Sequence, residues 1–202
     1  MTAFDYKMLK IKNIAQIYKQ LFTTVWQFWH TPEQAWHEAT TTTIGTRHFY
    51  HHYVLPSIGL CVLAAFTGCM IRGANGITAA VSALINGGML MAALWLAKLM
   101  CRTCLKRSYN ITPTAEECNK IVGYPFSIMF ALNISHSLFP TWFFVIILAF
   151  YVVYELWFAA EVFFQLEENN RGRFLLFNSL AIIFLPILLD RVSTWLLPNI
   201  MH

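Results

Sequence analysis

Charged side chains are scarce in this chain of 202 residues, of which Asp, Glu, Lys and Arg make up only 12%. Soluble domains carry about 25% charged residues, so this composition excludes an ordinary soluble domain. Hydrophobic residues make up 57% of the chain, and the mean hydropathy is +0.52. The sequence therefore indicates a small membrane protein, with room for one domain of several spans.

Catalytic and targeting signals are also missing. No nucleophile motif, phosphate-binding loop or pair of active-site carboxylates stands out, so we expect no enzyme activity, no cofactor and no nucleic-acid partner. The first 30 residues hold four lysines and no short apolar core before a cleavage site, so we expect no signal peptide.

The cysteines and histidines indicate neither a disulfide framework nor a metal site. An odd count of five cysteines argues against a disulfide framework. Cys101, Cys104 and Cys118 lie near one another in sequence, but a structural zinc site needs four ligands. We therefore expect no metal site, and we assign His48, His51 and His52 to the membrane interface.

Long apolar runs define the fold class. A helix needs about 20 apolar residues to cross a bilayer. We predict an all-α polytopic bundle in residues 53–202, preceded by a separate N-terminal region in residues 1–52. The five predicted spans are residues 53–71, 77–100, 121–139, 142–164 and 174–197.

The third and fourth runs are separated by almost no polar residues. Pro140 cannot continue a helix, and it biases Phe139 away from helical geometry. We expect a tight hairpin there, because one helix over residues 121–164 would be far too long for a bilayer. Without that turn the protein would have one span fewer.

Basic residues are distributed unevenly between the two sides of this topology. Of the 14 Lys and Arg residues, all but Arg72 and Arg191 fall on the side of the N-terminus. Loops rich in Lys and Arg stay in the cytoplasm. We therefore predict a cytoplasmic N-terminus and an outward C-terminus.

The N-terminal region has helical periodicity, with lysines and amides largely on the other face. Such a basic amphipathic helix suits the surface of an anionic inner leaflet, and the alternative is a helix packed on the protein's own spans. Its apolar positions are Ile11, Ile14, Tyr18, Leu21, Phe22, Val25 and Trp29.

Two further helix starts are signalled by capping residues. Thr31 precedes Pro32, and Gln34 completes a capping-box pattern with Thr31. Thr114 and Glu117 repeat the capping-box pattern just before the third span. We expect a short second helix from the first pattern and the start of the third span from the second.

Four stretches resemble one known family. They are Pro32-Glu33-Gln34-Ala35-Trp36, "FYHHYVLPSIGLCVLAAFTG", "CNKIVGYPFSIMFALNI" and "YVVYELWFAAEVFFQLEENNRGRFLLF". Together they are similar, in the same order, to bacterial members of the Yip-one domain family. The resemblance implies five spans in a bacterial inner membrane and no established activity. The Asp/Glu-Leu-Tyr-Gly-Pro motif of eukaryotic members is absent, so no GTPase partner is implied.

One acid stands out inside a predicted span. Glu155 lies roughly 20 Å along the fourth span at 1.5 Å per residue, and Tyr151 lies one turn away. An ionised carboxylate in hydrocarbon costs several kcal/mol. Glu155 is therefore either a proton, ion or ligand site, or a hydrogen-bonded carboxyl that fixes helix packing. By contrast, Glu161 is expected at the membrane surface.

Other polar and small residues indicate helix contacts. Asp190 in the fifth span is expected to accept a hydrogen bond from a neighbouring helix. Small residues at four-residue spacing form close-packing stripes. The amides expected to bridge spans are Asn86, Asn133 and Asn178, and the stripes are Ala79, Ala83 and Gly87 in the second span and Ala64 and Gly68 in the first.

Two functions fit these features. The first is an integral membrane scaffold or adaptor that organises the bilayer or other membrane proteins, with the N-terminal region as its cytoplasmic contact. The alternative is a small oligomeric transporter or channel with Glu155 on its path. Few polar residues lie in the predicted interior, so the first is preferred. Partners are the lipid bilayer, other membrane proteins and a second copy of the chain.

Overall fold

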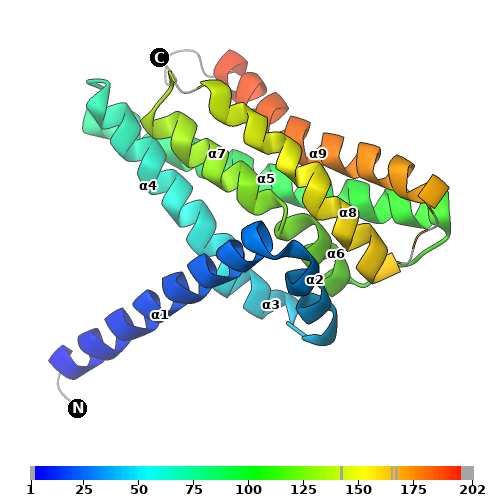
Figure 1. Ribbon diagram of the computed structural model, residues 1–202. Coiled ribbons are helices and arrows are strands. Elements are labelled where there is room, and N and C mark those ends of the chain that lie inside the picture. The colour runs from blue at the N-terminus through cyan, green and yellow to red at the C-terminus, as the bar shows by residue number, and fades with distance from the viewer. Residues whose placement is uncertain (1–2, 142, 165, 167, 197–202) are drawn as a thin grey trace.

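The computed structural model describes residues 3–141, 143–164, 166 and 168–196, and every regular element in that part of the chain is a helix (Figure 1). Most elements are α-helices, joined by one π-helical turn, η1, and one 3₁₀ helix, η2. The elements are α1 (Ala3–His30), α2 (Pro32–Thr41), α3 (Thr46–Phe49), η1 (Tyr50–Val54), α4 (Leu55–Ile71), α5 (Gly76–Tyr109), α6 (Ala115–Gly123), α7 (Phe126–Leu138), η2 (Phe143–Phe150), α8 (Tyr151–Phe164) and α9 (Glu168–Leu196).

Four segments are long and apolar enough to cross a membrane, and α6 and α7 form a further pair bent by 42°. The structure therefore confirms a helical bundle with four to five candidate spans. The four segments are Thr46–Ile71, Gly76–Tyr109, Ile147–Phe164 and Asn170–Trp195.

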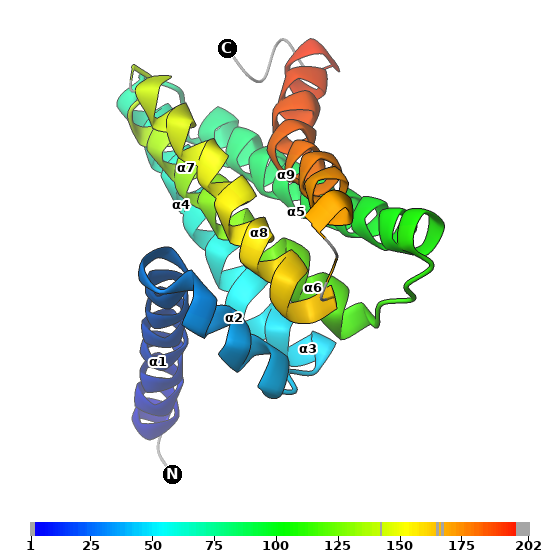
Figure 2. The same cartoon turned by 45° about the vertical axis from the view of Figure 1, so that its right-hand side comes forward.

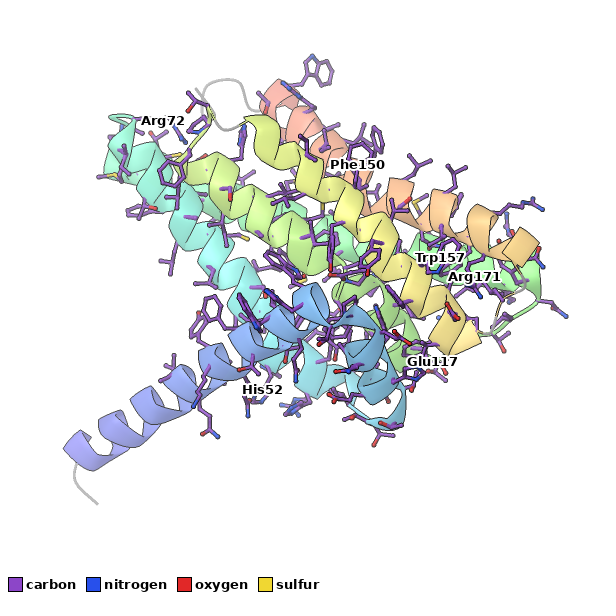
Figure 3. All side chains as sticks on the ribbon, in the orientation of Figure 1. His52, Arg72, Glu117, Phe150, Trp157 and Arg171 are labelled. Atoms are coloured by element: carbon purple, nitrogen blue, oxygen red, sulfur yellow. The ribbon has the colours of Figure 1, made fainter. Side chains whose placement is uncertain are left out.

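The long helices pass back and forth between two ends of the bundle. In the bundle α4 packs against α5 and α7, while α9 packs against α5 and α8 (Figures 1 and 2). Arg72 and Glu117 lie at opposite ends (Figure 3). The end with α2, α3 and α6 is called the basic end, because Lys98, Arg102 and Lys120 lie there.

The N-terminal helix lies differently from the others. It runs across the direction of α4 and α8 in both views, whereas α2 follows α8 (Figures 1 and 2). Leu21 and Phe28 are buried against the bundle, but Phe22 is 62% exposed and Trp26 is 63% exposed. Among the predicted apolar positions, Leu21 therefore faces the bundle, whereas Phe22 and Ile14, which is 46% exposed, lie on an open edge. The Ile11 side chain lies outside those described.

The third predicted span is not one continuous helix but the bent pair of α6 and α7, which makes a fifth span if the two helices cross the membrane together. Its first part, α6, ends at Gly123, and α7 begins at Phe126. Pro125 between them has no N–H to donate, so the helix bends at that point. The second predicted span is also longer than expected. It was predicted to end at residue 100, but α5 continues to Tyr109 and stops at Asn110, whose φ of 52° is left-handed.

The capping predictions had mixed outcomes. The box at Thr114 is confirmed: its hydroxyl accepts from Glu117 N at 3.2 Å, and its own N–H donates to the Glu117 carboxylate at 2.8 Å. The helix predicted at Pro32 is also confirmed, but its capping box is wrong. The Thr31 hydroxyl donates to the Gln27 carbonyl at 3.2 Å, since α1 continues almost to that residue.

The last two spans differ from prediction at their ends. Phe143–Phe150 wind as the 3₁₀ helix η2 before α8 begins, and α9 starts at Glu168 rather than at residue 174. The expected break at Pro140 is present, because α7 ends at Leu138 and η2 begins at Phe143. The predicted ends at Trp142 and Leu197 lie outside the described residues.

The small-residue stripes lie at helix contacts, as predicted. Ala79, Ala83 and Gly87 are buried on α5. A Cβ added at Gly87 would lie 2.5 Å from the Val62 side chain, and one at Gly68 would lie 2.0 Å from the Ser137 carbonyl oxygen. These glycines therefore set the distances between α4 and its neighbours α5 and α7.

We predict that Gly68→Ala lowers the free energy of unfolding by about 1–3 kcal/mol, because the methyl group meets backbone that cannot move aside locally. Gly88→Ala is the matched control, since a Cβ there meets no heavy atom within 4 Å. The control should be neutral or stabilising by about 0.5–1 kcal/mol. Thermal unfolding in detergent measures both, and equal melting of the two variants would contradict the close contact.

Candidate functional site

Glu155 lies on the buried face of α8 and has no exposed surface. Within the described part of the chain, no group donates a hydrogen bond to either carboxylate oxygen. Its neighbours on the same face are Val152, Leu156 and Ala159, all apolar and buried. An unpaired charge in such surroundings costs several kcal/mol, so this environment favours the neutral acid.

Two phenols lie near enough to Glu155 to interact with it electrostatically, those of Tyr53 and Tyr151. The Tyr151 hydroxyl donates to the Trp29 carbonyl at 2.8 Å, and the Tyr53 hydroxyl donates to the Tyr124 carbonyl at 3.5 Å. The first bond is of ordinary length and the second is long. The predicted neighbour Tyr151 thus joins α8 to the end of α1.

The last turn of α1 contacts the bundle close to Tyr151. The Trp29 indole N–H donates to the Ser127 hydroxyl at 3.3 Å, so the one residue contacts both α7 and α8. Sequence reasoning placed Trp29 on the apolar face of an amphipathic helix and gave it no polar role. Two features of the sequence could have indicated a polar role: the indole N–H of this otherwise apolar side chain and its position near the end of the helix.

Trp36 anchors α2 to the bundle. The side chain is fully buried, and its ring lies 5.0 Å from that of Phe28, 5.9 Å from Tyr124 and 5.7 Å from Phe163, all edge to face. Edge-to-face aromatic pairs add stability beyond the area they bury. Trp36 therefore holds α2, and through Phe28 also the end of α1, on the bundle.

Lys120 fastens the segment after α2. Its ammonium is buried and donates to the Ala39 carbonyl at 2.9 Å and to the Thr42 carbonyl at 2.6 Å. It also pairs with Glu116 at 2.9 Å, and the same carboxylate oxygen accepts from Ile44 N at 2.7 Å. These contacts, called the Lys120 clamp, tie residues 39–44 to α6. Their residues were missed, because the sequence analysis counted Lys120 only as a loop charge.

Lys98, beside the clamp, also joins segments that are distant in sequence. Lys98 donates to the Asn119 amide oxygen at 3.1 Å and to the Tyr50 hydroxyl. The Asn119 amide then donates to the Thr46 hydroxyl at 3.2 Å. Because Lys98 falls inside a predicted span, its position among apolar residues was the one signal that could have revealed this network.

The predicted bridging amides behave in two ways. Asn86 on α5 and Asn133 on α7 exchange two hydrogen bonds of 3.0 Å each, which confirms the bridge for this pair. Asn178 on α9 is buried, but it donates to the Phe174 carbonyl of its own helix at 2.9 Å. Its amide oxygen has no partner in the described part of the chain.

The remaining acids lie at the surface. Asp190 is exposed, and no hydrogen bond reaches its carboxylate from the residues that the structure describes. The bond expected from a neighbouring helix is therefore not seen there. Glu161 is 53% exposed and pairs with Arg171 at 3.1 Å, as its predicted surface position implied. The Arg171 guanidinium also lies 5.1 Å from the centre of the Trp157 ring (Figure 3).

The cysteines and histidines do not form a metal centre among the described residues. Cys101, Cys104 and Cys118 are free, and no group of three or more His, Cys, Asp or Glu side chains is arranged to hold an ion in that part of the chain. The His48 and His52 rings instead stack on each other at 4.0 Å.

Comparison with protein-family models, with curated proteins and with solved structures finds no match to this chain. The resemblance to the Yip-one domain family therefore stays a prediction. The contacts within the structure carry the functional argument.

We predict that Lys120→Met loosens residues 39–44, because the clamp loses its ammonium and two carbonyls lose their donor, at a cost of about 1–3 kcal/mol. Hydrogen exchange measured by mass spectrometry should show faster exchange in that segment. Lys106→Met removes an exposed lysine and is the control. Unchanged exchange over residues 39–44 in Lys120→Met would contradict the clamp.

We predict that Asn86→Leu and Asn133→Leu each destabilise the bundle by about 1 kcal/mol, because each leaves one amide unpaired between helices. The double variant should recover most of that loss, since no amide is then left unpaired. A double-mutant cycle of unfolding free energies tests the bridge. Simple additivity of the two losses would show that the pair is not coupled.

Proposed function

We propose that this chain is a non-catalytic integral membrane scaffold of the five-span Yip-like type, located in a bacterial inner membrane. The bent pair of α6 and α7 serves as the third of its five spans. Its N-terminal helices α1 and α2 are the cytoplasmic contact through which it organises other membrane proteins.

The charge distribution supports the orientation. All but two of the lysines and arginines belong to the N-terminal side of the topology, and Lys98, Arg102 and Lys120 lie at the basic end, whereas Arg72 lies at the opposite end (Figure 3). By the positive-inside rule the basic end faces the cytoplasm. The N-terminus is then inside, and the C-terminus is outside.

The observation that carries the proposal is the way in which α2 is held. Trp36 and the Lys120 clamp fix its inner side to the bundle, while polar residues on its outer side remain exposed, charged and titratable ones among them. A polar surface that is already rigid loses little conformational entropy when a protein partner binds. Among these exposed residues are Glu33, Gln34, His37 and Glu38.

The open edge of α1 also fits the lipid surface. Phe22 and Trp26 are exposed there, and α1 runs across the direction of the spans, as a helix in the membrane plane does (Figures 1 and 2). Aromatic residues favour the membrane interface, and lysines attract anionic headgroups. The exposed Lys19 and the lysines of the first 12 residues supply that charge.

These contacts favour a scaffold over the alternative of a transporter or channel. The side chains of Asn86 and Asn133 satisfy each other, which is how amides join helices. The face of α8 around Glu155 is otherwise apolar. A water-filled route needs a more continuous polar lining than the described residues provide.

We predict that tagged wild-type protein, extracted gently, isolates a reproducible set of membrane proteins, and that Glu33→Lys/Glu38→Lys loses that set. Reversing two charges on the outer face of α2 places like charges against a complementary partner surface. The double variant Thr103→Lys/Ser108→Lys is the control, because it adds lysines to exposed positions of α5 at the same end.

The control should retain the partners, and thermal unfolding should show that both variants are folded. Two outcomes would contradict the scaffold. One is a wild-type protein that comes out without partners, and the other is a partner set that the α2 variant leaves unchanged. Liposomes that contain the purified protein and leak solute or ions above empty liposomes would favour the transporter instead.

A further inference from the structure

A group of cations at the ends of two neighbouring helices pairs with no acid among the described residues. Lys106 and Arg107 belong to the last turn of α5, and Arg173 lies near the start of α9. All three side chains are exposed. The ion pairs found in the described part of the chain involve other residues. These three residues are called the α5–α9 cationic group.

The two helix ends that carry this group lie side by side (Figure 1). The Tyr109 hydroxyl at the end of α5 donates to the Asn170 carbonyl of α9 at 3.0 Å, and its ring lies 6.5 Å from the Phe174 ring. Arg107 belongs to the same last turn as Tyr109. Arg173 is the residue before Phe174. The cations therefore lie at nearly the same level of two packed helices.

That level is the boundary of the predicted spans. The second predicted span ends at residue 100, and the fifth begins at residue 174, so Arg173 directly precedes a span. Helix α5 has 34 residues, or about 51 Å at 1.5 Å per residue, whereas the hydrocarbon core of a bilayer is about 30 Å thick. Its last turns, with Lys106 and Arg107, therefore extend past the hydrocarbon into the region of the headgroups.

Exposed apolar side chains continue from the cations along both helices. On α5, Trp95 is 57% exposed and Leu99 is 42% exposed. At about 100° per residue, they lie with the two cations of α5 within about a third of the helix circumference. On α9, Arg173 shares about a sixth of the circumference with three exposed apolar residues. These are Phe177, Leu180 and Phe184. A phospholipid has the same order, with a charged headgroup next to its acyl chains.

The helix dipole explains only part of this arrangement. Cations in the last turn of a helix interact favourably with its C-terminal carbonyls, which accounts for Lys106 and Arg107. Arg173 lies near the N-terminal end of its helix, where the dipole gives a cation no advantage. Like charges at one level repel each other, so an anion placed among them is favoured.

We propose that the ends of α5 and α9 bind an anionic phospholipid that carries two phosphate groups. One phosphate contacts Lys106 and Arg107, the other contacts Arg173, and acyl chains follow Leu99 and Phe177. Basic sites between spans on the cytoplasmic side bind lipid headgroups of this kind, and guanidinium groups suit phosphate oxygens. The site is separate from α2, and it rests on the proposed function only for the orientation of the basic end towards the inner leaflet.

Native mass spectrometry of the full-length protein in detergent tests the site. Cardiolipin is the probe with two phosphates, and phosphatidylglycerol is the probe with one. The wild type should bind cardiolipin about fivefold more tightly, because one further contact between a cation and an anionic headgroup contributes about that factor. Equal binding of the two lipids, or no binding of either, would overturn the proposal. This comparison uses the wild type alone and does not depend on the folding of a variant.

The double variant Arg107→Gln/Arg173→Gln should weaken cardiolipin binding by about thirtyfold, since it removes two such contacts. The matched control is Arg47→Gln/Arg191→Gln, which removes the same charge from exposed positions elsewhere and should bind cardiolipin like the wild type. Equal weakening in both double variants would show a general effect of charge and would overturn the site.

Isolation of membrane partners with Arg107→Gln/Arg173→Gln keeps this test apart from that of the scaffold. The outer face of α2 is unchanged in this variant, so its partner set should be retained while cardiolipin binding falls. A lost partner set with unchanged cardiolipin binding would mean that the α5–α9 cationic group contacts protein, and the lipid site would be overturned. Failure of the wild type to isolate partners would contradict the scaffold and leave the lipid measurement as it stands.

Discussion

One buried ammonium ties the segment between α2 and α3 to the bundle. Lys120 has almost no access to water, so it has to find acceptors inside the protein, and it finds them in the carbonyls of Ala39 and Thr42 and in the Glu116 carboxylate. Because these acceptors belong to two distant segments, their union fixes the segment after α2 on α6. The chain passes through this fixed segment on its way from α2, where Trp36 is buried, to α3 and the first span.

The interior uses polar groups of three kinds. The Asn86–Asn133 pair is closed and complete, so it holds two spans at a fixed register. The Lys98 and Lys120 networks are also satisfied, and they join the N-terminal region to the spans. Glu155 alone is buried with both oxygens unpaired among the described residues. Buried polar groups without a partner are rare in proteins, so each one calls for an explanation, of which a functional role is one.

The sequence predicted local features well and distant contacts poorly. Apolar runs located the long helices, and the capping box at Thr114 was readable because its two partners are three residues apart. The same pattern failed at Thr31, where the preceding helix supplies a competing carbonyl at Gln27. The Lys120 clamp joins residues about 80 positions apart, and nothing in a lysine's neighbours along the chain reveals such partners. Glu155 could be identified from the sequence, because a charged residue inside a long apolar run is recognisable without knowledge of the fold.

The π-helical turn at Tyr50–Val54 lies at the start of the first candidate span, where its winding sets the orientation of the residues before it. A π turn holds one more residue than an α turn. If this turn relaxed to α-helical winding, everything before it would swivel by about 100° around the axis of the span, the rotation that one residue produces. The Lys98 and Lys120 networks hold the chain on the N-terminal side of this turn, so they oppose that rotation. A difference of one residue in this turn therefore separates two orientations of the N-terminal helices on an unchanged set of spans.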